Sequence, residues 1–215
     1  SPNIMGDFMV LFAPMAAGMA YYCRDWKAKA FFWCCTFAMC LSCLFTMSRG
    51  AWVAMAVAVL VFALLHDRKL LLLVLAAGFV SLFIPFVASR IGYLFTEEFA
   101  ASTTNGGRAS RWELGLLYLS ASPMLGLGLG MFGGAVAVQH KVYSWMSYFY
   151  MDNYYLKILT EMGYVGFAFF IALMACLVLI GLRAVYRTKK SDGGKMSPLC
   201  TGMFAGLCGV LVHCY

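Results

Sequence analysis

Long apolar runs, separated by short clusters of charged residues, constrain the fold of this chain more than any other feature of its sequence. Of its 215 residues, 63% are hydrophobic and only 12% are charged, whereas soluble domains carry about 45–50% apolar and about 25% charged residues. The mean hydropathy is +0.83. Since a membrane-spanning helix needs about 20 mostly apolar residues, the pattern predicts an all-α, polytopic transmembrane bundle rather than a water-soluble core.

Six apolar runs are candidates for membrane spans. They are Phe8–Tyr22, Ala30–Met47, Ala51–Leu65, Leu70–Ala88, Tyr154–Leu182 and Leu199–Tyr215. We expect a single membrane domain over residues 1–215, with an extracytoplasmic loop at 89–152 that contains short interfacial helices. Because the chain begins at Ser1 and stops inside an apolar run, we also expect it to be a fragment of a larger membrane protein.

The charged clusters orient the predicted spans. Clusters at residues 24–29, 67–69 and 183–195 fall on one side of the membrane and together hold ten basic and three acidic residues. The other side holds six residues of each sign, so the formal net charge of +7 lies on one face. Lys and Arg near span ends accumulate on the cytoplasmic side, which places the loop outside. The excess charge then reflects topology, and no nucleic-acid partner is needed to explain it.

The cysteines and histidines form no pattern that is typical of a metal site. Cys40 and Cys43 make a C-x-x-C pair, but no second pair lies at zinc spacing and the flanks are apolar, which favours simple packing. His66, His140 and His213 stand in a charged cluster, in the loop and in the last apolar run, and no Ser–His–Asp order stands out. We therefore expect no metal and no other cofactor.

One arginine, Arg49, interrupts the apolar stretch TMSRGAWVAM at the predicted extracytoplasmic turn between the second and third spans. Gly50 is expected to make this turn. Two interpretations of the arginine stay open. It is either a cation that lies at the membrane interface beside Trp52, or an anion-binding group that faces a cavity.

The predicted outer loop carries several short motifs. Arg90–Ala101 is expected to be a short surface helix, Ser102–Gly107 a flexible turn, and the stretch RASRWELGLLYLSAS, which starts at Arg108, a helix at the membrane interface. The glycines of PMLGLGLGMFGG (Pro123–Gly134) match a dinucleotide fingerprint only weakly, because no strand–helix unit surrounds them. Close approach of the backbone to a ligand or to the interface fits them better, with plain flexibility as the alternative.

A polar stripe opens the last long run. On one helix face it contains Asn153, Lys157, Thr160, Glu161 and Tyr164. A solvated helix end would explain the stripe, but ionisable groups at membrane depth are costly unless they meet water, a partner or a substrate. We therefore favour the polar wall of a cavity that also receives Arg49 and Arg108. Asp152, just before the stripe, is suited to cap the helix.

The arginines suggest a site for phosphate. A guanidinium group stays charged and binds phosphate oxygens in a bidentate manner, so Arg49, Arg108 and Arg111 could stabilise a diphosphate leaving group without a metal. Four blocks, FTMSRGAWVA, GRASRWELGL, PMLGLGLGMF and DNYYLKILTEMGYVG, resemble in order and spacing the O-antigen ligase family, which includes O-antigen and exopolysaccharide polymerases. The resemblance covers most of the chain.

This resemblance implies a GT-C-like glycosyltransferase of the bacterial inner membrane, with its site on the periplasmic face. It would transfer or polymerise glycan from a polyprenyl-diphosphate carrier to a hydroxyl of a glycan or glycolipid acceptor, with inversion and without a metal. Arg49 and Arg108 match arginines of two family blocks and would hold the diphosphate, with Arg111 as a helper. A transporter or flippase of lipid-linked saccharides is the alternative, and a membrane scaffold without a site is a third hypothesis.

The block that opens the late span departs from the family pattern. In ligases it reads His-Asn, with the histidine as the proposed base, whereas this chain has Asp152 and Asn153. The departure fits a polymerase-like member better than a ligase in the narrow sense. Asp152 could accept a proton from a sugar hydroxyl or only cap the helix, and Glu161 is a second candidate base. The expected catalytic residues are Asp152, Arg49 and Arg108, and the expected substrate-binding residues are Arg49, Arg108, Arg111, Asn153, Lys157 and Glu161.

Overall fold

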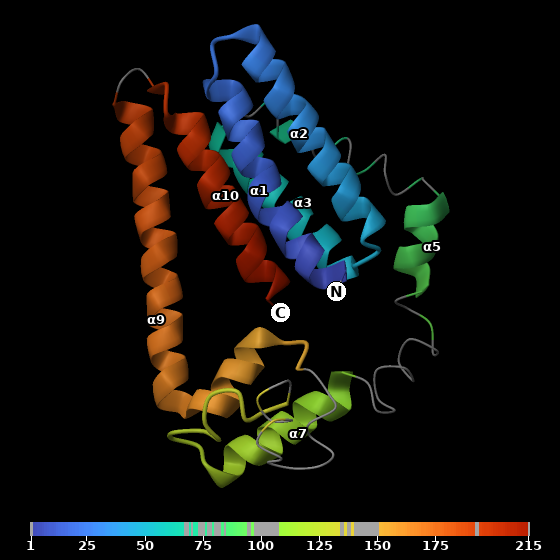
Figure 1. Ribbon diagram of the computed structural model, residues 1–215, viewed down its shortest axis with the longest axis vertical. Coiled ribbons are helices and arrows are strands. Elements are labelled where there is room, and N and C mark those ends of the chain that lie inside the picture. The colour runs from blue at the N-terminus through green and yellow to red at the C-terminus, as the bar shows by residue number, and fades with distance from the viewer. Residues whose placement is uncertain are drawn as a thin grey trace. The chain divides into compact units, whose positions relative to one another are not determined.

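The computed structural model describes residues 2–66, 85–93, 108–133, 151–191 and 194–214, together with isolated positions between 69 and 139. Within these ranges the regular elements are helices (Figure 1), which confirms the all-α prediction. The helices are α1 (Pro2–Tyr22), α2 (Trp26–Phe45), α3 (Arg49–His66), α5 (Pro85–Tyr93), α7 (Arg108–Ala121), α9 (Tyr154–Lys190) and α10 (Ser197–His213).

Four of the described helices are long and apolar enough to cross a membrane. They cover Asn3–Tyr22, Trp26–Phe45, Arg49–His66 and Tyr154–Lys190, and α10 is a shorter apolar helix. Five of the six predicted runs therefore correspond to apolar helices, which confirms a polytopic helical bundle. The sixth run, Leu70–Ala88, lies largely outside the described residues.

Other predictions also fall wholly or partly outside the described residues. They concern Asp67, Arg68, the turn Ser102–Gly107, His140 and most of the surface helix predicted at Arg90–Ala101. The described part of that predicted helix is the end of α5, which begins earlier, at Pro85. The helix predicted from Arg108 is confirmed as α7, and its location at the membrane interface stays a prediction.

The chain divides into two compact units, which are described separately here. Unit 1 contains residues 1–80 and 175–213, and unit 2 contains residues 81–174 and 214–215. Helix α9 contributes its first part to unit 2 and its second part to unit 1. The expectation of a single membrane domain stays a prediction.

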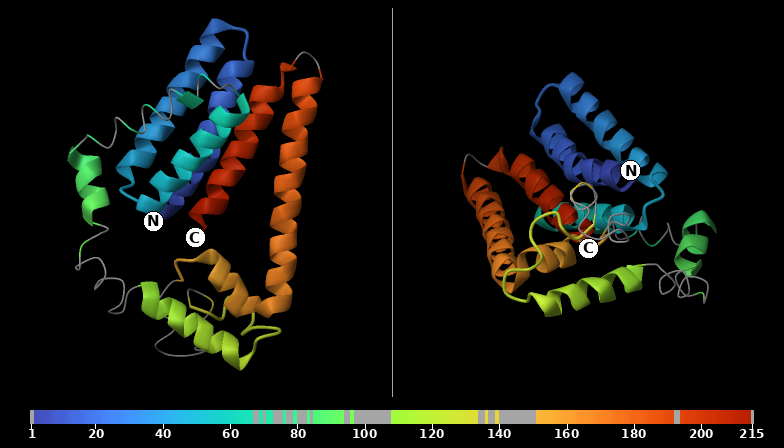
Figure 2. Two further views of the ribbon diagram at one scale, coloured as in Figure 1. Left: turned by 180° about the vertical axis from the view of Figure 1, so that it is seen from behind. Right: turned by 60° about the horizontal axis from the view of Figure 1, so that its bottom comes forward.

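In unit 1, α10 packs along both α1 and α3, and α2 packs along α1 (Figures 1 and 2). Small side chains make this packing close. A Cβ atom added to Gly202 would lie 2.3 Å from the carbonyl oxygen of Pro14, and one added to Gly206 would lie 2.4 Å from that of Leu11. Small residues that let helix backbones approach are typical of membrane helix interfaces.

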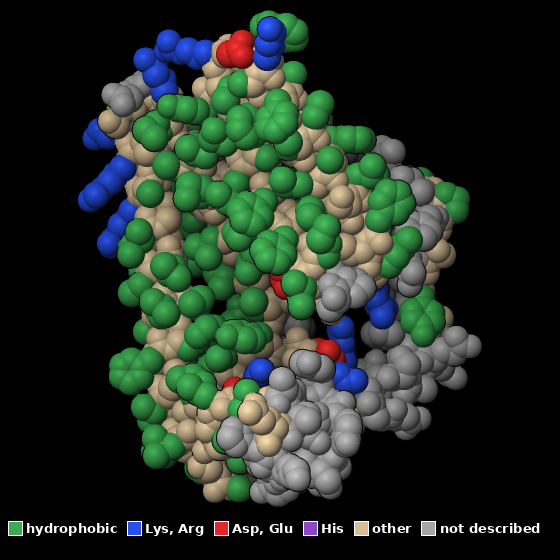
Figure 3. Space-filling view, viewed as in Figure 1, with side chains coloured by type: hydrophobic (Ala, Val, Ile, Leu, Met, Phe, Trp, Pro, Cys, Tyr) green, Lys and Arg blue, Asp and Glu red, His purple; other side chains and the backbone are tan. Residues whose placement is uncertain are grey.

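The outer surface of these helices is apolar (Figure 3). On α2, Trp26, Phe37 and Phe45 are each about 70% exposed, at 72%, 69% and 71%. All nine cysteines are free thiols, and Cys43 is buried beside the carbonyl oxygen of Ala51, which accepts from its Sγ at 3.7 Å. Packing therefore describes Cys43 better than metal chemistry does.

Two of the three basic clusters, at residues 24–29 and 183–195, have described residues at one end of unit 1. The link between α1 and α2 and the link between α9 and α10 lie at the same end (Figure 1). The ring centroids of Tyr21, near the end of α1, and His66, the last residue of α3, lie 4.3 Å apart, so α3 ends there too. The starts of α1 and α3 and the end of α10 lie at the opposite end. The helix ends of unit 1 are therefore grouped as the predicted spans require, and the side of the membrane that each end faces stays a prediction.

The turn between α2 and α3 differs from its prediction. Met47, with φ of 54°, has the left-handed backbone, and Gly50 is already the second residue of α3. The prediction that Gly50 makes the turn is therefore wrong. Ser48 caps α3, since its Oγ accepts from the amide of Ala51 at 3.4 Å. The indole of Trp52 donates back to the carbonyl oxygen of Cys43 at 3.2 Å, which ties α3 to the end of α2.

Asp25 gives a first prediction, because it caps α2 at the basic end of unit 1. Its side chain accepts from the amide of Ala28 at 3.3 Å. We expect Asp25→Ala to lower the free energy of unfolding by about 1 kcal/mol. Asp25→Asn keeps the acceptor and should leave stability nearly unchanged. Thermal unfolding of the detergent-solubilised protein measures both, and an equal loss in the two variants would assign the effect to the lost charge instead.

Candidate functional site

Two arginines of α7 meet one carboxylate in unit 2. Nη1 of Arg111 lies 2.8 Å from Oδ2 of Asp152, and Nε of Arg108 lies 3.6 Å from the same oxygen. The arginines are three residues apart, which places them on one face of α7. Two cations face one anion, so the group has a net positive charge.

This arginine–carboxylate group is accessible to solvent. The side chains of Arg108, Arg111 and Asp152 are 62%, 30% and 27% exposed. A guanidinium group has five N–H donors in a planar fork that matches the geometry of phosphate oxygens. The arrangement can therefore bind an anion such as a phosphate, in exchange for or beside the carboxylate of Asp152.

Asn153 caps α9. Its Oδ1 accepts from the amide of Leu156 at 3.0 Å, and the residue is 7% exposed. The amide of Tyr154 donates to the carbonyl oxygen of Cys214 at 2.8 Å. The cap that was predicted at Asp152 therefore belongs to its neighbour, and the carboxylate of Asp152 is engaged by arginines. Asn153, expected to bind substrate, has a structural role in these contacts.

Helix α9 is broken at Gly163, where φ is 64° and ψ is −172°. A break leaves carbonyl and amide groups without partners inside the helix. The carbonyl oxygens of Thr160 and Glu161 accept from the amides of Leu127 and Gly128 at 3.0 and 2.9 Å. Beyond the break, the amide of Tyr164 donates to the carbonyl oxygen of Pro123 at 2.8 Å.

The glycine-rich segment after α7 thus docks on the broken helix, and two glycines permit its close approach. A Cβ atom at Gly126 would lie 2.5 Å from the carbonyl group of Glu161, and one at Gly163 would lie 2.3 Å from the carbonyl oxygen of Met124. We expected these glycines to let the backbone approach a ligand or the membrane interface closely, and a close approach of the backbone is observed. In the described contacts, the group approached is the chain's own helix α9.

Glu161 is buried in this docking site. It is 3% exposed, and its Oε1 accepts from the amide of Phe132 at 3.2 Å. Phe132 itself is 1% exposed, so the carboxylate fixes the end of the docked segment. Glu161 was expected to bind substrate or act as a second base, but its described contacts are those of a structural residue.

The predicted polar stripe is divided by the break. Thr160 is fully buried and its Oγ1 donates to the carbonyl oxygen of Leu156 at 2.8 Å, whereas Tyr164, beyond Gly163, is 55% exposed. Lys157 is half-buried. The stripe is therefore not one continuous polar wall along the helix.

Glu161 leads to a second prediction. We expect Glu161→Ala to lower the free energy of unfolding by about 1–3 kcal/mol, because the buried amide of Phe132 loses this acceptor. Glu161→Gln keeps an oxygen acceptor and should retain most of the stability. Thermal unfolding is measured on the same preparations as the transferase activity that the sequence resemblance implies. A glutamine variant that folds normally but loses transfer would contradict the structural role and would support a role as a base.

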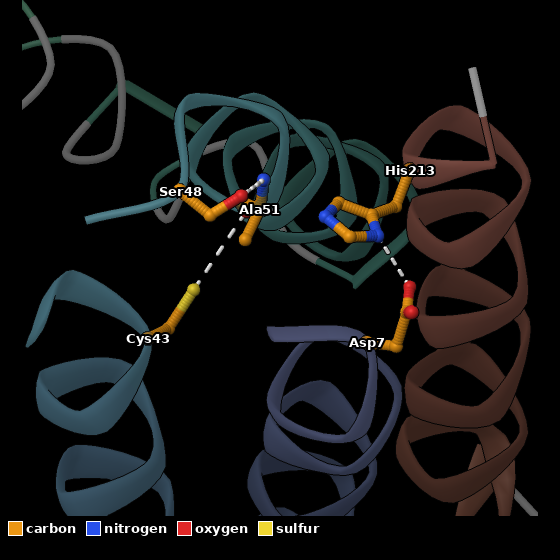
Figure 4. Close-up of polar contacts among 5 residues, drawn as sticks. All are labelled: Asp7, Cys43, Ser48, Ala51 and His213. Carbon is orange, nitrogen blue, oxygen red and sulfur yellow. Dashed lines mark hydrogen bonds and ion pairs between the residues drawn. The ribbon is translucent and has the colours of Figure 1, made fainter. Parts of the chain in front are cut away.

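Unit 1 has its own polar group at the end opposite the basic clusters. Arg49 is the exposed first residue of α3. Nδ1 of His213, the last residue of α10, forms a short hydrogen bond with Oδ1 of Asp7 in α1 (Figure 4). Arg49 belongs to unit 1 and Arg108 to unit 2, so the predicted convergence of the two stays a prediction.

Sequence reasoning missed the pair of Asp7 and His213. The residues are 206 positions apart, and no spacing rule links them. The available signal was that each is a lone ionisable residue near the predicted outer end of an apolar run, where an unpaired charge is costly.

Among the residues that the structure describes, no group of three or more His, Cys, Asp or Glu side chains lies together as a candidate metal site. The cationic groups that contact Asp152 are arginines. The profile of the O-antigen ligase family matches residues 34–171, which is more than half of the chain and includes all four sequence blocks. The chain belongs to the O-antigen ligase family.

No curated protein matches the chain at a significant level. Membership of the O-antigen ligase family confirms the resemblance that the four blocks indicated. It assigns the chain to the membrane glycan ligases and polymerases of O-antigen assembly. With its long apolar helices, it also identifies a multi-pass protein of the bacterial inner membrane.

Proposed function

We propose that this member of the O-antigen ligase family is a glycosyltransferase that uses a polyprenyl-diphosphate-linked glycan as donor. It transfers or polymerises the glycan onto a hydroxyl of a glycan or glycolipid acceptor. The observation that carries the proposal is the contact of Arg111 and Arg108 with Asp152, at 2.8 and 3.6 Å. An accessible pair of guanidinium groups around one anionic oxygen is suited to a diphosphate.

The arginines supply the charge that the reaction needs. When the bond between the anomeric carbon and the phosphate oxygen breaks, negative charge develops on the leaving diphosphate. Guanidinium groups already held in place stabilise this charge without reorganisation and without a metal. Asp152 keeps them aligned before the donor arrives, and the diphosphate oxygens then replace or join its carboxylate.

Two further cations support the donor in this proposal. Lys157 lies in the second turn of α9, half-buried, four residues after the capping Asn153. Arg49 opens α3, in the family block SRG. We assign Arg49 to the donor because of that block. We also place the active site on the extracytoplasmic side of the membrane, since Arg49 lies at the end of unit 1 opposite the basic clusters.

Asp152 has a positioning role in this proposal. A carboxylate oxygen 2.8 Å from a guanidinium nitrogen is already engaged in a charge-assisted hydrogen bond. Its alternative role as a base predicts that Asp152→Asn removes kcat and leaves donor KM unchanged. The positioning role predicts that the same variant chiefly raises donor KM.

The test is an in vitro assay with the purified full-length protein, a defined polyprenyl-diphosphate oligosaccharide and an acceptor glycan, in vesicles. We expect a new glycosidic bond, detected by mass spectrometry, with release of polyprenyl diphosphate. The yield should not change with EDTA. Movement of the lipid-linked saccharide across the bilayer without any new bond would contradict the proposal and favour the flippase.

A further inference from the structure

The end of α9 carries basic side chains that the proposed function does not use. Residues 183–195 hold five basic residues and one acidic residue, Asp192, which lies outside the described residues. Arg187, Lys189 and Lys190 stand in the last turn of α9 and are exposed. Figure 3 shows Lys and Arg side chains along the outer edge of this helix end. Within the part of the chain that the structure describes, Arg187 and Lys190 have no ion pair, so their charges are open to a partner outside the chain.

One side of this helix end packs inside unit 1 and the other side faces outward. A Cβ atom added to Gly181 would lie 2.6 Å from an aromatic ring of α10, and Val185, one turn later, is fully buried. Tyr186, Arg187 and Lys190 lie about 100–160° around the helix from Val185, and all three are exposed. We call these three residues the basic face.

By its position along α9, the basic face falls at the depth of lipid headgroups. Beyond the break at Gly163, residues 164–182 contain no charged side chain. At about 1.5 Å per residue they form a helix of about 28 Å, which matches a hydrocarbon core of about 30 Å. Arg187 lies about 7 Å further along the axis, and the headgroup layer on each side of the core is about 5–8 Å thick. The side chain of Lys190 points back toward the helix start, and so toward Arg187.

Before the basic face, the same side of α9 is apolar and exposed. Leu179 and Ile180 are 50% and 61% exposed. Leu179 precedes Tyr186 by about two turns and Ile180 precedes Arg187 by the same interval, which places them on the same side of the helix. A ligand that fits this side has an anionic head and an apolar body. A soluble phosphate ion fits only the basic part, whereas a phospholipid fits both.

We propose that the basic face binds the phosphate group of an anionic phospholipid of the surrounding bilayer, with phosphatidylglycerol as the representative lipid. The guanidinium group of Arg187 donates to two phosphate oxygens, and the ammonium group of Lys190 adds a second cation beside it. The ring of Tyr186 lies at headgroup level, where tyrosine is enriched in membrane proteins. The acyl chains of the lipid cover Leu179 and Ile180. This inference goes beyond the proposed function and does not depend on it.

The test measures lipid binding to the purified full-length protein in neutral detergent micelles, with added phosphatidylglycerol or phosphatidylcholine. We expect only phosphatidylglycerol to raise Tm, by about 3–6 °C at about ten times its Kd, and to be retained in native mass spectrometry. Arg187→Gln combined with Lys190→Gln should raise this Kd about 10–30-fold, since each basic residue near a membrane surface contributes about fivefold. Lys27→Gln combined with Lys29→Gln is the matched control. It removes the same charge from exposed residues of α2 at the same end of unit 1, and it should keep the gain in Tm.

Several results would overturn the inference. A full gain in Tm when Arg187 and Lys190 are replaced, or an equal loss in both double variants, would remove the basic face as the binding site. A fall in Tm that is the same with and without phosphatidylglycerol would leave the cations with only the role of stabilising the carboxyl end of α9. An equal gain from glycerol phosphate would show a soluble anion in place of a lipid. Arg187→Lys keeps the charge but loses the planar fork, so it should retain only part of the lipid affinity.

Discussion

Replacing Arg111 by alanine is expected to lower kcat/KM for glycan transfer by about 10²–10³-fold, the usual effect of removing one charge-stabilising donor. Arg111 makes the closer of the two contacts to Asp152, at 2.8 Å, and is the less exposed arginine of the pair. It therefore has the better-defined orientation toward a bound anion. The transfer assay with purified protein measures the loss, and binding of the lipid-linked donor is measured in parallel.

The conservative variant separates charge from geometry. Arg111→Lys keeps the positive charge but loses the planar fork that binds two phosphate oxygens. We expect it to regain only a small part of the lost activity. Arg108→Ala should lower activity as well, and the double variant should fall further, but by less than the product of the single effects because both groups face one anion.

Arg183→Ala is a matched control, since it removes an exposed arginine from the part of α9 that belongs to unit 1. It should leave transfer unchanged. Full activity of Arg111→Ala and Arg108→Ala together, in protein that is folded, would contradict the assignment of this group to the donor. The diphosphate would then have to bind elsewhere.

Gly163→Ala is expected to cause a large loss of stability in unit 2. The backbone at Gly163 has φ of 64° and ψ of −172°, a combination that is essentially restricted to glycine. The added Cβ atom would also lie 2.3 Å from the carbonyl oxygen of Met124. Backbone strain and overpacking together should lower the free energy of unfolding by roughly 2–6 kcal/mol.

The loss has a structural consequence beyond stability. If the docked segment leaves the break, the carbonyl oxygens of Thr160 and Glu161 lose the amides of Leu127 and Gly128. We therefore expect lower thermal stability together with faster amide hydrogen exchange at residues 126–128. Gly92→Ala is the control, because it adds a methyl group to a helical glycine of α5 that has no described atom within 4 Å of the new Cβ position. An alanine at Gly163 that is as stable as the control would contradict the account of the broken helix.

Much of the fold follows from short stretches of sequence. The apolar runs predicted α1, α2, α3, α9 and α10, because burial of the backbone in a membrane requires continuous apolar helices. The charge pattern predicted which ends of unit 1 lie together, and the four blocks predicted the family. The stretch from Arg108 predicted α7 because arginines and a tryptophan at its start are followed by leucines, as in a helix at the membrane interface. These signals depend on residues within a few turns of each other.

The site was predicted less completely. Arg108, Arg111 and Asp152 were all named as site residues, but their contact was not foreseen, and Asp152 was also considered as a cap. Aspartate and asparagine are both favoured at N-caps, so sequence alone could not decide between Asp152 and Asn153 as the cap. Glu161 was considered as a ligand because a carboxylate near a membrane is costly without a partner. That partner is the amide of Phe132, 29 positions away.

Sequence alone therefore determined the class of fold and the family, since hydrophobicity and motif order are properties of the chain itself. Only the tertiary structure showed that the glycine-rich segment satisfies the broken α9, that Asp152 meets two arginines and that His213 meets Asp7. Each of these depends on pairing polar groups from distant segments. A buried polar group needs a partner, but nothing in its local sequence specifies which distant residue provides it.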